Sequence, residues 1–350
     1  MMIQCGNSVC RVAKLQSLSR AFLGDCAPGH VAVAKKPSAK RAAHLKTCVS
    51  AVSQNISEEY QSVEFDFACP ICTTTLFKLR QTGGKPTGDL TCPRCQRTFS
   101  ASSASVDLTL TSGVQQKVYE QRSWGGTEIF RNPLVSLAYE RGWRQGFAWA
   151  GFPGVDRETE IALEYLKPAY GEVLVDMSCG SGLFSRKFLA SGNFSGVIAA
   201  DFSESMLREA RSYFEQDTSL DSGKYLLVRA DVARLPFATG SLAAINASAA
   251  IHCWPNPQAA LVEISRCLRP GGVFVASTFL SGIAPLGQIL GNDDLVRPLR
   301  GLEPTTGSYR WWEEDELKDL CTAMGLQGFE RERNNRFIMF TVRKPGIHGD

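Results

Sequence analysis

The segment Val173-Leu-Val-Asp-Met-Ser-Cys-Gly-Ser-Gly182 constrains the fold of this chain more than any other. An apolar run of strand length leads into a turn of small residues, and a helical pattern follows. A glycine-rich turn lets a ligand approach the backbone closely, and the N-terminus of the next helix offers free N–H groups. This arrangement is typical of nucleotide sites in open α/β sheets.

The same alternation continues through positions 168–350. Short apolar strands are predicted at Val173–Met177, Val197–Asp201, Tyr225–Arg229, Leu242–Ala247 and Val273–Ser277, with helices at Ser203–Phe214, Pro257–Leu268 and Glu313–Met324. Strands separated by helices indicate a mainly parallel sheet with helices on both faces. We therefore predict an α/β domain over these residues.

The charge at the end of the first strand distinguishes two ligands that such a turn could hold. The dinucleotide fingerprint is G-x-G-x-x-G, but Ser185 stands where its third glycine would be. Asp176 at the end of the strand would repel a pyrophosphate, whereas it would attract a ligand with a positive ammonium and sulfonium. The segment therefore favours S-adenosylmethionine over NAD.

Further features follow in the order that this cofactor requires. Asp201 ends the second strand, 19 residues after Gly182, where a carboxylate can accept both ribose hydroxyls. Asp231-Val232 follows the third strand and is placed for the adenine amino group. Leu235-Pro-Phe237 and Leu268-Arg-Pro-Gly-Gly272 come next. An aspartate at a helix start is often only a cap, so the argument depends on the order of the features together.

Positions from about 113 to 345 resemble the methyltransferases of the ubiquinone/menaquinone-biosynthesis type. The resemblance lies in Asp176-x-x-Cys-Gly-Ser-Gly, Ala200-Asp-Phe-Ser-x-x-Met206, Asp231-x-x-x-Leu-Pro-Phe237 and Leu268-Arg-Pro-Gly-Gly. In addition, Phe130-Arg-Asn-Pro-Leu and Tyr139-Glu-Arg-Gly-Trp-Arg144 resemble a plant group of chloroplast methyltransferases found in plastoglobules.

The resemblance implies a Rossmann-like, seven-stranded class I methyltransferase sheet and methyl transfer from S-adenosylmethionine. It implies cofactor contacts at Asp176, Gly180, Gly182, Asp201, Met206 and Asp231, to which we add the neighbouring Ser178, Cys179, Phe202, Val232 and Ser248. One position departs from the family, because Ser178 stands where the first loop glycine is usual. If that position needs a positive φ, the serine is strained.

Two cysteine pairs, Cys69-Pro-Ile-Cys72 and Cys92-Pro-Arg-Cys95, are separated by 19 residues. Two such pairs can close a tetrahedral site with four thiolates, which predicts a structural Zn²⁺ rather than a catalytic one. The site would stabilise a small β-rich module at 58–112, similar to that of bacterial ribosomal-RNA guanine methyltransferases. The alternative is four reduced, buried cysteines without metal.

The charge of the chain is divided unevenly. Of its 38 Lys and Arg and 35 Asp and Glu, positions 1–57 hold eight and one, so the remainder has 30 bases and 34 acids. A basic leader without an apolar core predicts a transit peptide, and its few arginines relative to lysines favour the chloroplast. A disordered tail without targeting function is the alternative. The acidic remainder disfavours nucleic acid as the substrate.

The acceptor side is expected past the fourth strand, at Ser248-Ala-Ala-Ile-His252-Cys-Trp254. His252 is the candidate general base or acceptor-positioning group, with a hydrogen-bonded loop histidine as the alternative. No Asn-Pro-Pro-aromatic sequence occurs there, which disfavours exocyclic amino groups as acceptors. A helical, aromatic-rich segment at 113–167 and Trp311-Trp312 could form a lid over an apolar acceptor, or could simply be core.

Three functions follow from these features. The first is methylation of a small, quinone- or prenyl-lipid-like acceptor in the chloroplast. The second is methylation of a ribosomal-RNA base, and the third is a cofactor-binding zinc protein without transferase activity. No apolar run of 18 residues occurs in the chain, so a transmembrane helix is not expected, and association with a membrane or plastoglobule would be peripheral.

Overall fold

The computed structural model describes residues 63–74, 76–80, 89–101, 105–113, 140, 142, 144–302 and 310–346. These residues fall within one compact unit, Tyr60–Asp350. The predicted transit peptide, 1–57, lies outside the described residues, as do Trp124, Phe130, Tyr139 and Trp143 of the predicted lid. Among the helices of the described part, all are too short or too polar to cross a bilayer.

A twisted sheet of eight strands forms the centre of the described structure, in the order β11-β12-β10-β9-β6-β7-β8-β5. Its strands in chain order are β5 (Val106–Asp107), β6 (Val173–Met177), β7 (Gly196–Asp201), β8 (Tyr225–Arg229), β9 (Leu242–Ala247), β10 (Leu268–Phe279), β11 (Gln327–Asn334) and β12 (Phe337–Arg343). The pairs from β10 to β5 are parallel, whereas β12 runs antiparallel to both β10 and β11.

The predicted α/β class I fold is confirmed, with one more strand than expected. The extra strand, β5, comes from the segment after the second cysteine pair. Val106 and Asp107 pair in parallel with Val228 and Arg229 of β8. An unpaired strand edge exposes N–H and C=O groups, so this short strand satisfies part of the β8 edge.

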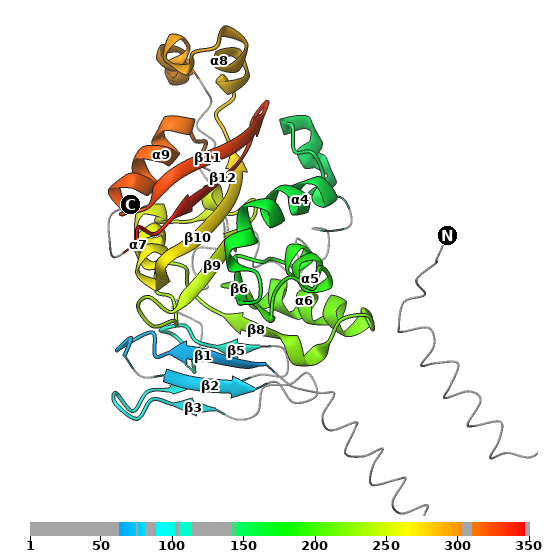
Figure 1. Ribbon diagram of the computed structural model, residues 1–350, viewed down its shortest axis with the longest axis vertical. Helices are drawn as coiled ribbons and strands as arrows, with labels where there is room; N and C mark the ends of the chain where they lie inside the picture. Colours follow the sequence, from blue (N-terminus) through cyan, green and yellow to red (C-terminus); the bar gives the residue numbers. More distant parts are fainter. Residues whose placement is uncertain are drawn as a thin grey trace, which may run out of the picture. The chain divides into compact units, whose positions relative to one another are not determined.

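Helices cover both faces of the sheet (Figure 1). They are α4 (Val155–Leu166), α5 (Leu183–Ala190), α6 (Glu204–Gln216), α7 (Pro257–Cys267), α8 (Ala284–Leu290) and α9 (Glu314–Ala323), with 3₁₀ turns η5 (Arg144–Ala150), η6 (Lys167–Ala169), η7 (Ser222–Lys224), η8 (Ile251–Cys253), η9 (Asp293–Leu295) and η10 (Arg297–Leu302). Consecutive residues of a strand face opposite layers. Accordingly, Leu174 packs into the core shared with α4, α5 and α6, and Val175 into the core shared with α7 and α9.

The cysteine-bearing segment forms two short hairpins, as the β-rich prediction expected. They are β1 (Glu64–Ala68) with β2 (Leu76–Arg80), and β3 (Leu90–Thr91) with β4 (Thr98–Phe99). Phe65, Phe67 and Phe99 are buried and belong to the same hydrophobic core as α7 and α9. The hairpins therefore share a hydrophobic core with the sheet and do not form a separate domain.

Candidate functional site

The turn between β6 and α5 has positive φ angles, which agrees with its glycine-rich sequence. Gly180 and Gly182 have φ values of 57° and 77°. A Cβ atom on Gly182 would lie 2.7 Å from Cε2 of Phe214, so the position requires glycine for space as well as for conformation. Ser178 also has a positive φ, 59°, and so carries the strain that a serine at a glycine position implies.

Asp176 lies at the carboxyl end of β6 and is almost fully buried. Its carboxylate accepts hydrogen bonds from Ser185 Oγ and from Asn246 Nδ2, the latter at 2.7 Å. Burial raises the pKa of Asp176 to about 6, and the two donors oppose that shift. A buried carboxylate with donors on one side and open space on the other is suited to a cation.

A small, partly open cavity lies beside this carboxylate. Four of the predicted cofactor residues line it, and so do two residues that the sequence analysis did not name: Asp176, Ser178, Cys179 and Ser248, together with Leu183 and Phe184. The last two belong to the first turn of α5. Only the tertiary structure shows that these two residues border the cavity.

Asp201 at the end of β7 is hydrogen-bonded to the same turn. Its Oδ2 accepts a hydrogen bond from the backbone N–H of Gly180 at 2.8 Å, and its Oδ1 accepts one from that of Ser203 at 2.8 Å. Burial raises the pKa of Asp201, and the backbone donors oppose this shift. The following Phe202 lies next to the Arg229 guanidinium, and Met206 is buried in the first turns of α6.

Asp231 and Val232 follow β8, as predicted, but they do not line that cavity. Asp231 Oδ1 accepts a hydrogen bond from the backbone N–H of Ala233 at 2.9 Å, which shapes a tight turn. Glu140, which the sequence analysis passed over, accepts hydrogen bonds from Ser181 Oγ and from Arg186 at 2.6 Å. The sequence feature that could have indicated Glu140 is its place in the Tyr139-Glu-Arg motif.

His252 lies in η8, past the end of β9, and is buried. Its Nδ1 lies 3.2 Å from Thr278 Oγ1, and its ring meets Phe279 edge-on with centroids 4.9 Å apart. Burial, and then the charge of Arg144, lower the pKa of His252 to about 3, so the imidazole is neutral near pH 7. Burial also raises the pKa of the neighbouring Cys253, which keeps that thiol protonated.

Aromatic side chains surround Phe279 at the carboxyl end of β10. The ring centroids of its neighbours lie between 4.5 and 6.4 Å from its own, and these neighbours are Phe147, Trp149, Phe152, Trp311 and His252. We call these six residues the aromatic cluster. Trp149 is 62% exposed, so one side of the cluster reaches the surface. His252, Trp311 and the aromatic-rich segment at 113–167, which holds Phe147, Trp149 and Phe152, were predicted for the acceptor side, whereas Phe279 at the centre was not.

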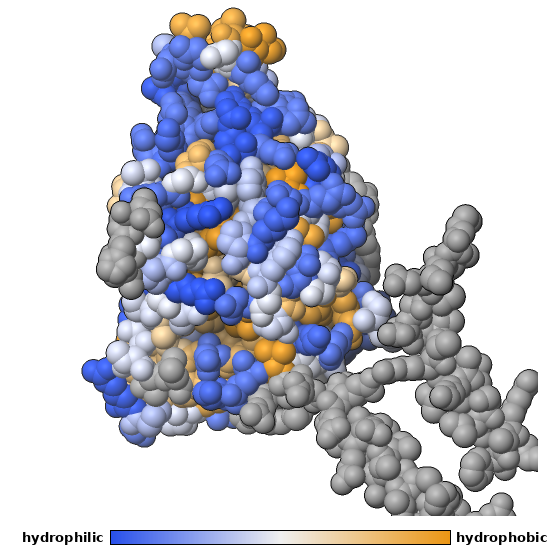
Figure 2. Space-filling model, in the orientation of Figure 1, coloured by the Kyte–Doolittle hydropathy of each residue, from blue (hydrophilic) through white to orange (hydrophobic). Residues whose placement is uncertain are grey.

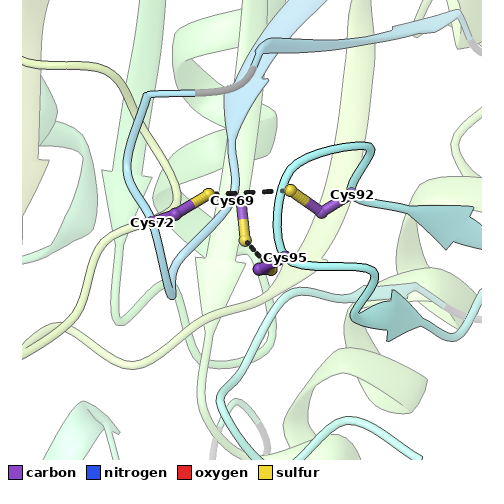
Figure 3. Close-up of side chains that lie close together, drawn as sticks. All are labelled: Cys69, Cys72, Cys92 and Cys95. Atoms are coloured by element: carbon purple, nitrogen blue, oxygen red, sulfur yellow. Dashed lines mark hydrogen bonds between the residues drawn. The ribbon is translucent and has the colours of Figure 1, made fainter.

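The four predicted metal ligands come together. The sulfur atoms of Cys69, Cys72, Cys92 and Cys95 all lie within 4.8 Å of one another, and the pairs Cys69–Cys95 and Cys72–Cys92 are 3.6 Å apart (Figure 3). Thiolates bound about 2.3 Å from one tetrahedral ion would be separated by about 3.8 Å. The cluster therefore has the dimensions of a four-thiolate metal site.

Comparison with known proteins assigns the fold to a family. Residues 175–276 match the model of a methyltransferase domain. Two uncharacterized chloroplastic methyltransferases of Arabidopsis thaliana are each 46% identical to the chain, one over 80% of this chain and 78% of the relative, the other over 79% and 78%. The chain belongs to the class I S-adenosylmethionine-dependent methyltransferases.

More distant relatives of this methyltransferase cover less of it. A demethylmenaquinone methyltransferase of Clavibacter sepedonicus is 35% identical over 34% of this chain and 46% of that protein. Among solved structures, phosphoethanolamine N-methyltransferase 2 of Haemonchus contortus in complex with S-adenosyl-L-methionine aligns with a TM-score of 0.46 and 15% identity, over 62% of this chain and 60% of that one. These matches leave the acceptor of this methyltransferase open.

Proposed function

We propose that this methyltransferase acts on a small, apolar acceptor with a flat ring, of the quinone or prenyl-lipid kind. The observation that carries the proposal is the aromatic cluster. It lies at the carboxyl end of β10, includes His252 past β9, and exposes Trp149. Substrates of open α/β sheets bind at the carboxyl ends of the strands. A wall of aromatic rings there suits stacking against an apolar ring.

The cofactor would be held by the turn after β6 and by the ends of β7 and β8. Asp176 and Asp201 would supply negative charge for the ammonium and acceptors for the ribose hydroxyls, and Asp231-Val232 would border the adenine. Ser178, Cys179, Gly180, Gly182 and Ser248 would line the same site, with Phe202 and Met206 behind it. When bound, S-adenosylmethionine supplies an electrophilic methyl group, and the protein aligns the acceptor and excludes water.

His252 would position the acceptor and not remove a proton from it. With a pKa of about 3, the neutral imidazole is a weak base near pH 7. Its Nδ1 lies 3.2 Å from Thr278 Oγ1 and its ring meets Phe279 edge-on, so the imidazole borders the aromatic cluster where the acceptor would lie. Cys253 has no nucleophilic role in this proposal, because burial keeps it as a thiol.

A second surface feature supports an apolar acceptor. Five exposed apolar side chains gather on α8 and the turns after it, which follow β10 at the same end of the sheet: Leu286, Ile289, Leu290, Leu295 and Leu299. Figure 2 shows this apolar tip beyond a band of hydrophilic surface. The arginines next to it are paired with acids, as Arg297 is with Glu313 at 2.9 Å. An apolar tip whose neighbouring charges are paired suits the surface of a lipid body such as a plastoglobule.

The four-cysteine cluster is proposed to hold Zn²⁺ as a structural ion within a module at 58–112. Four thiolates fill a tetrahedral site and leave no position for water or substrate. Chloroplast location is proposed from the basic, acid-poor leader at 1–57 and from the chloroplastic relatives in Arabidopsis thaliana. Both assignments can be checked on the purified protein and in plant cells, by metal analysis and by a fluorescent fusion of the leader.

The decisive experiment incubates the protein with methyl-labelled S-adenosylmethionine and fractionated plastid extract. We expect label in the apolar lipid fraction, and we expect Trp149→Ala to lower that label more than Tyr170→Ala, since Tyr170 is exposed but lies outside the aromatic cluster. Label in ribosomal RNA would overturn the proposal in favour of a base methyltransferase. Cofactor binding with no label in lipid, RNA or protein would favour a non-catalytic role.

A further inference from the structure

The knuckle Cys69-Pro-Ile-Cys72 makes direct contact with the loop that follows β8. Arg234 donates from Nε to the carbonyl oxygen of Pro70 at 2.6 Å, and from Nη2 to that of Ile71 at 2.9 Å. Both acceptors lie between the two cysteines of the first pair. The positions of these carbonyls depend on the backbone conformation between the two cysteines. The conformation of the knuckle therefore affects the position of Arg234 and of its loop.

Two more contacts join the same partners. The backbone N–H of Ala68 donates to the carbonyl of Pro236 at 2.9 Å, and the rings of Phe67 and Phe237 lie 5.5 Å apart. Phe67 and Phe237 are both fully buried. The loop that runs from Asp231 to Phe237 is therefore attached to the cysteine-bearing segment by its arginine, by its backbone and by its aromatic end.

A separate set of contacts reaches the end of β7. Arg229, the last residue of β8, donates to Asp107 of β5 at 3.0 Å and to the carbonyl of Phe202 at 3.0 Å. It also pairs with Glu204 at the start of α6 at 2.9 Å. Because Phe202 directly follows Asp201, β5, which follows the cysteine hairpins in the chain, contributes through Arg229 to the position of the Asp201 carboxylate.

We propose that the four-cysteine module is a positioning scaffold for the ribose and adenine side of the cofactor site, with Arg234 as its main contact. The module faces the protein body through the carbonyls of its first knuckle, and a knuckle held by metal keeps those carbonyls at fixed positions. This inference rests on the proposed function, namely a metal at the four cysteines and the cofactor between Asp201 and Asp231.

The first test keeps the metal and removes the contact. Arg234→Met keeps most of the alkyl stem and loses both hydrogen bonds to the knuckle. We expect the full chain carrying this substitution to retain its metal, and to bind S-adenosylhomocysteine about fivefold to tenfold more weakly by calorimetry. Arg94→Met is the matched control: Arg94 belongs to the second cysteine pair and donates to Thr74, not to the loop. Its affinity should equal that of the wild type.

The second test removes the metal. In native protein treated with a chelator, we expect faster hydrogen exchange at the amides of residues 231–237 and weaker binding of S-adenosylhomocysteine, while the amides of β6 and β9 stay protected. Unchanged affinity in Arg234→Met, or equal losses in Arg234→Met and Arg94→Met, would overturn the scaffold role. Purified protein without bound metal, or wild type that does not bind S-adenosylhomocysteine, would instead overturn the proposed function.

Discussion

Trp254 donates a hydrogen bond from its indole Nε1 to Ser178 Oγ at 3.0 Å, and so joins the loop after β9 to the turn after β6. Ser178 is held at a positive φ that favours glycine. The Ser178 hydroxyl accepts a hydrogen bond from the Trp254 indole, which a glycine at position 178 could not provide. This hydrogen bond compensates for the backbone strain of the serine. One side chain connects the proposed acceptor side with the proposed cofactor side.

This contact predicts losses of stability of different size for two small substitutions. Ser178→Ala keeps the strain and removes the acceptor, so the free energy of unfolding should fall by about 1 to 2 kcal/mol. Ser178→Gly also removes the acceptor but relieves the strain, so its loss should be smaller. Denaturant unfolding of both variants and of Trp254→Phe, which removes the donor, measures these changes in the free energy of unfolding. An alanine variant as stable as the glycine variant would contradict the account.

Affinity for the cofactor should depend on pH through Asp176. Its pKa of about 6 lies above the ordinary value, so the ligand-free fold favours the protonated form and loses stability as pH rises toward 6. A cation binds the ionised form, so S-adenosylmethionine should bind more tightly at about pH 7.5 than at about pH 5. Asp176→Asn should bind at least about tenfold more weakly.

The control for this prediction is Asp156→Asn, since Asp156 is an exposed carboxylate that pairs with Lys187 on the surface. Its calorimetric affinity should match that of the wild type at both pH values. A weaker, residual pH dependence in Asp176→Asn is expected from Asp201, whose pKa burial also raises. An Asp176→Asn variant with wild-type affinity and pH dependence would show that the cation lies elsewhere.

His252 should contribute no ionisation to the pH–rate profile between about pH 5 and pH 8, because its pKa lies near 3. His252→Gln should lower the rate without changing the shape of that profile, once an acceptor is identified. Cys253→Ser, next to it, should have little effect on the rate. A step near the ordinary histidine pKa of about 6.5 that disappears in His252→Gln would restore the role of general base.

The buried ion pair of Arg144 and Glu158 should matter more for stability than any surface pair. The two side chains are 4% and 1% exposed, and burial raises the pKa of Glu158 against the opposing charge of Arg144. Glu158→Gln leaves the guanidinium buried without its counter-charge and should lower the free energy of unfolding by about 3 kcal/mol. Glu160→Gln breaks the exposed pair with Arg157 and should cost less than about 1 kcal/mol. Similar losses in urea unfolding would contradict this difference.

The apolar tip should bind uncharged lipid surfaces. Ile289 and Leu290 are 81% and 52% exposed on α8, and Ile289→Ser with Leu290→Ser should lower partitioning onto phosphatidylcholine vesicles by at least about tenfold. Because the nearby arginines are paired, added salt should change binding little. Val262→Ser, at a half-exposed position on α7, is the control. Equal binding by both variants would remove the lipid surface from the proposal.

Much of the cofactor side followed from the chain order alone. The strand and turn from Val173 to Gly182 were predicted as observed, and the ends of β7 and β8 lie where Asp201 and Asp231 indicated. Local patterns suffice here because a parallel strand with two buried faces must be continuously apolar, and a tight turn needs glycine. The four-cysteine cluster could be predicted in the same way, since the spacing of metal ligands is a local property of the sequence.

The partners of these residues did not follow from the sequence. Nothing in the chain order pairs Trp254 with Ser178, or Arg234 with the carbonyls of Pro70 and Ile71, because each contact crosses from one loop to another. The ionisation of His252 also depended on the fold. Its sequence context is compatible with a base, but burial beside Phe279 and Arg144 lowers its pKa.

The amino-acid sequence by itself determined the parallel strands of the sheet, the family, the glycine-rich turn after β6 and the four-cysteine cluster, because each depends on short-range spacing and strand periodicity. Only the tertiary structure decided that β5 pairs with the β8 edge, that the cysteine hairpins share a core with the sheet, and that an aromatic cluster forms around Phe279. Contacts between distant segments depend on which faces are left uncovered once the sheet has formed, and a linear pattern does not specify that.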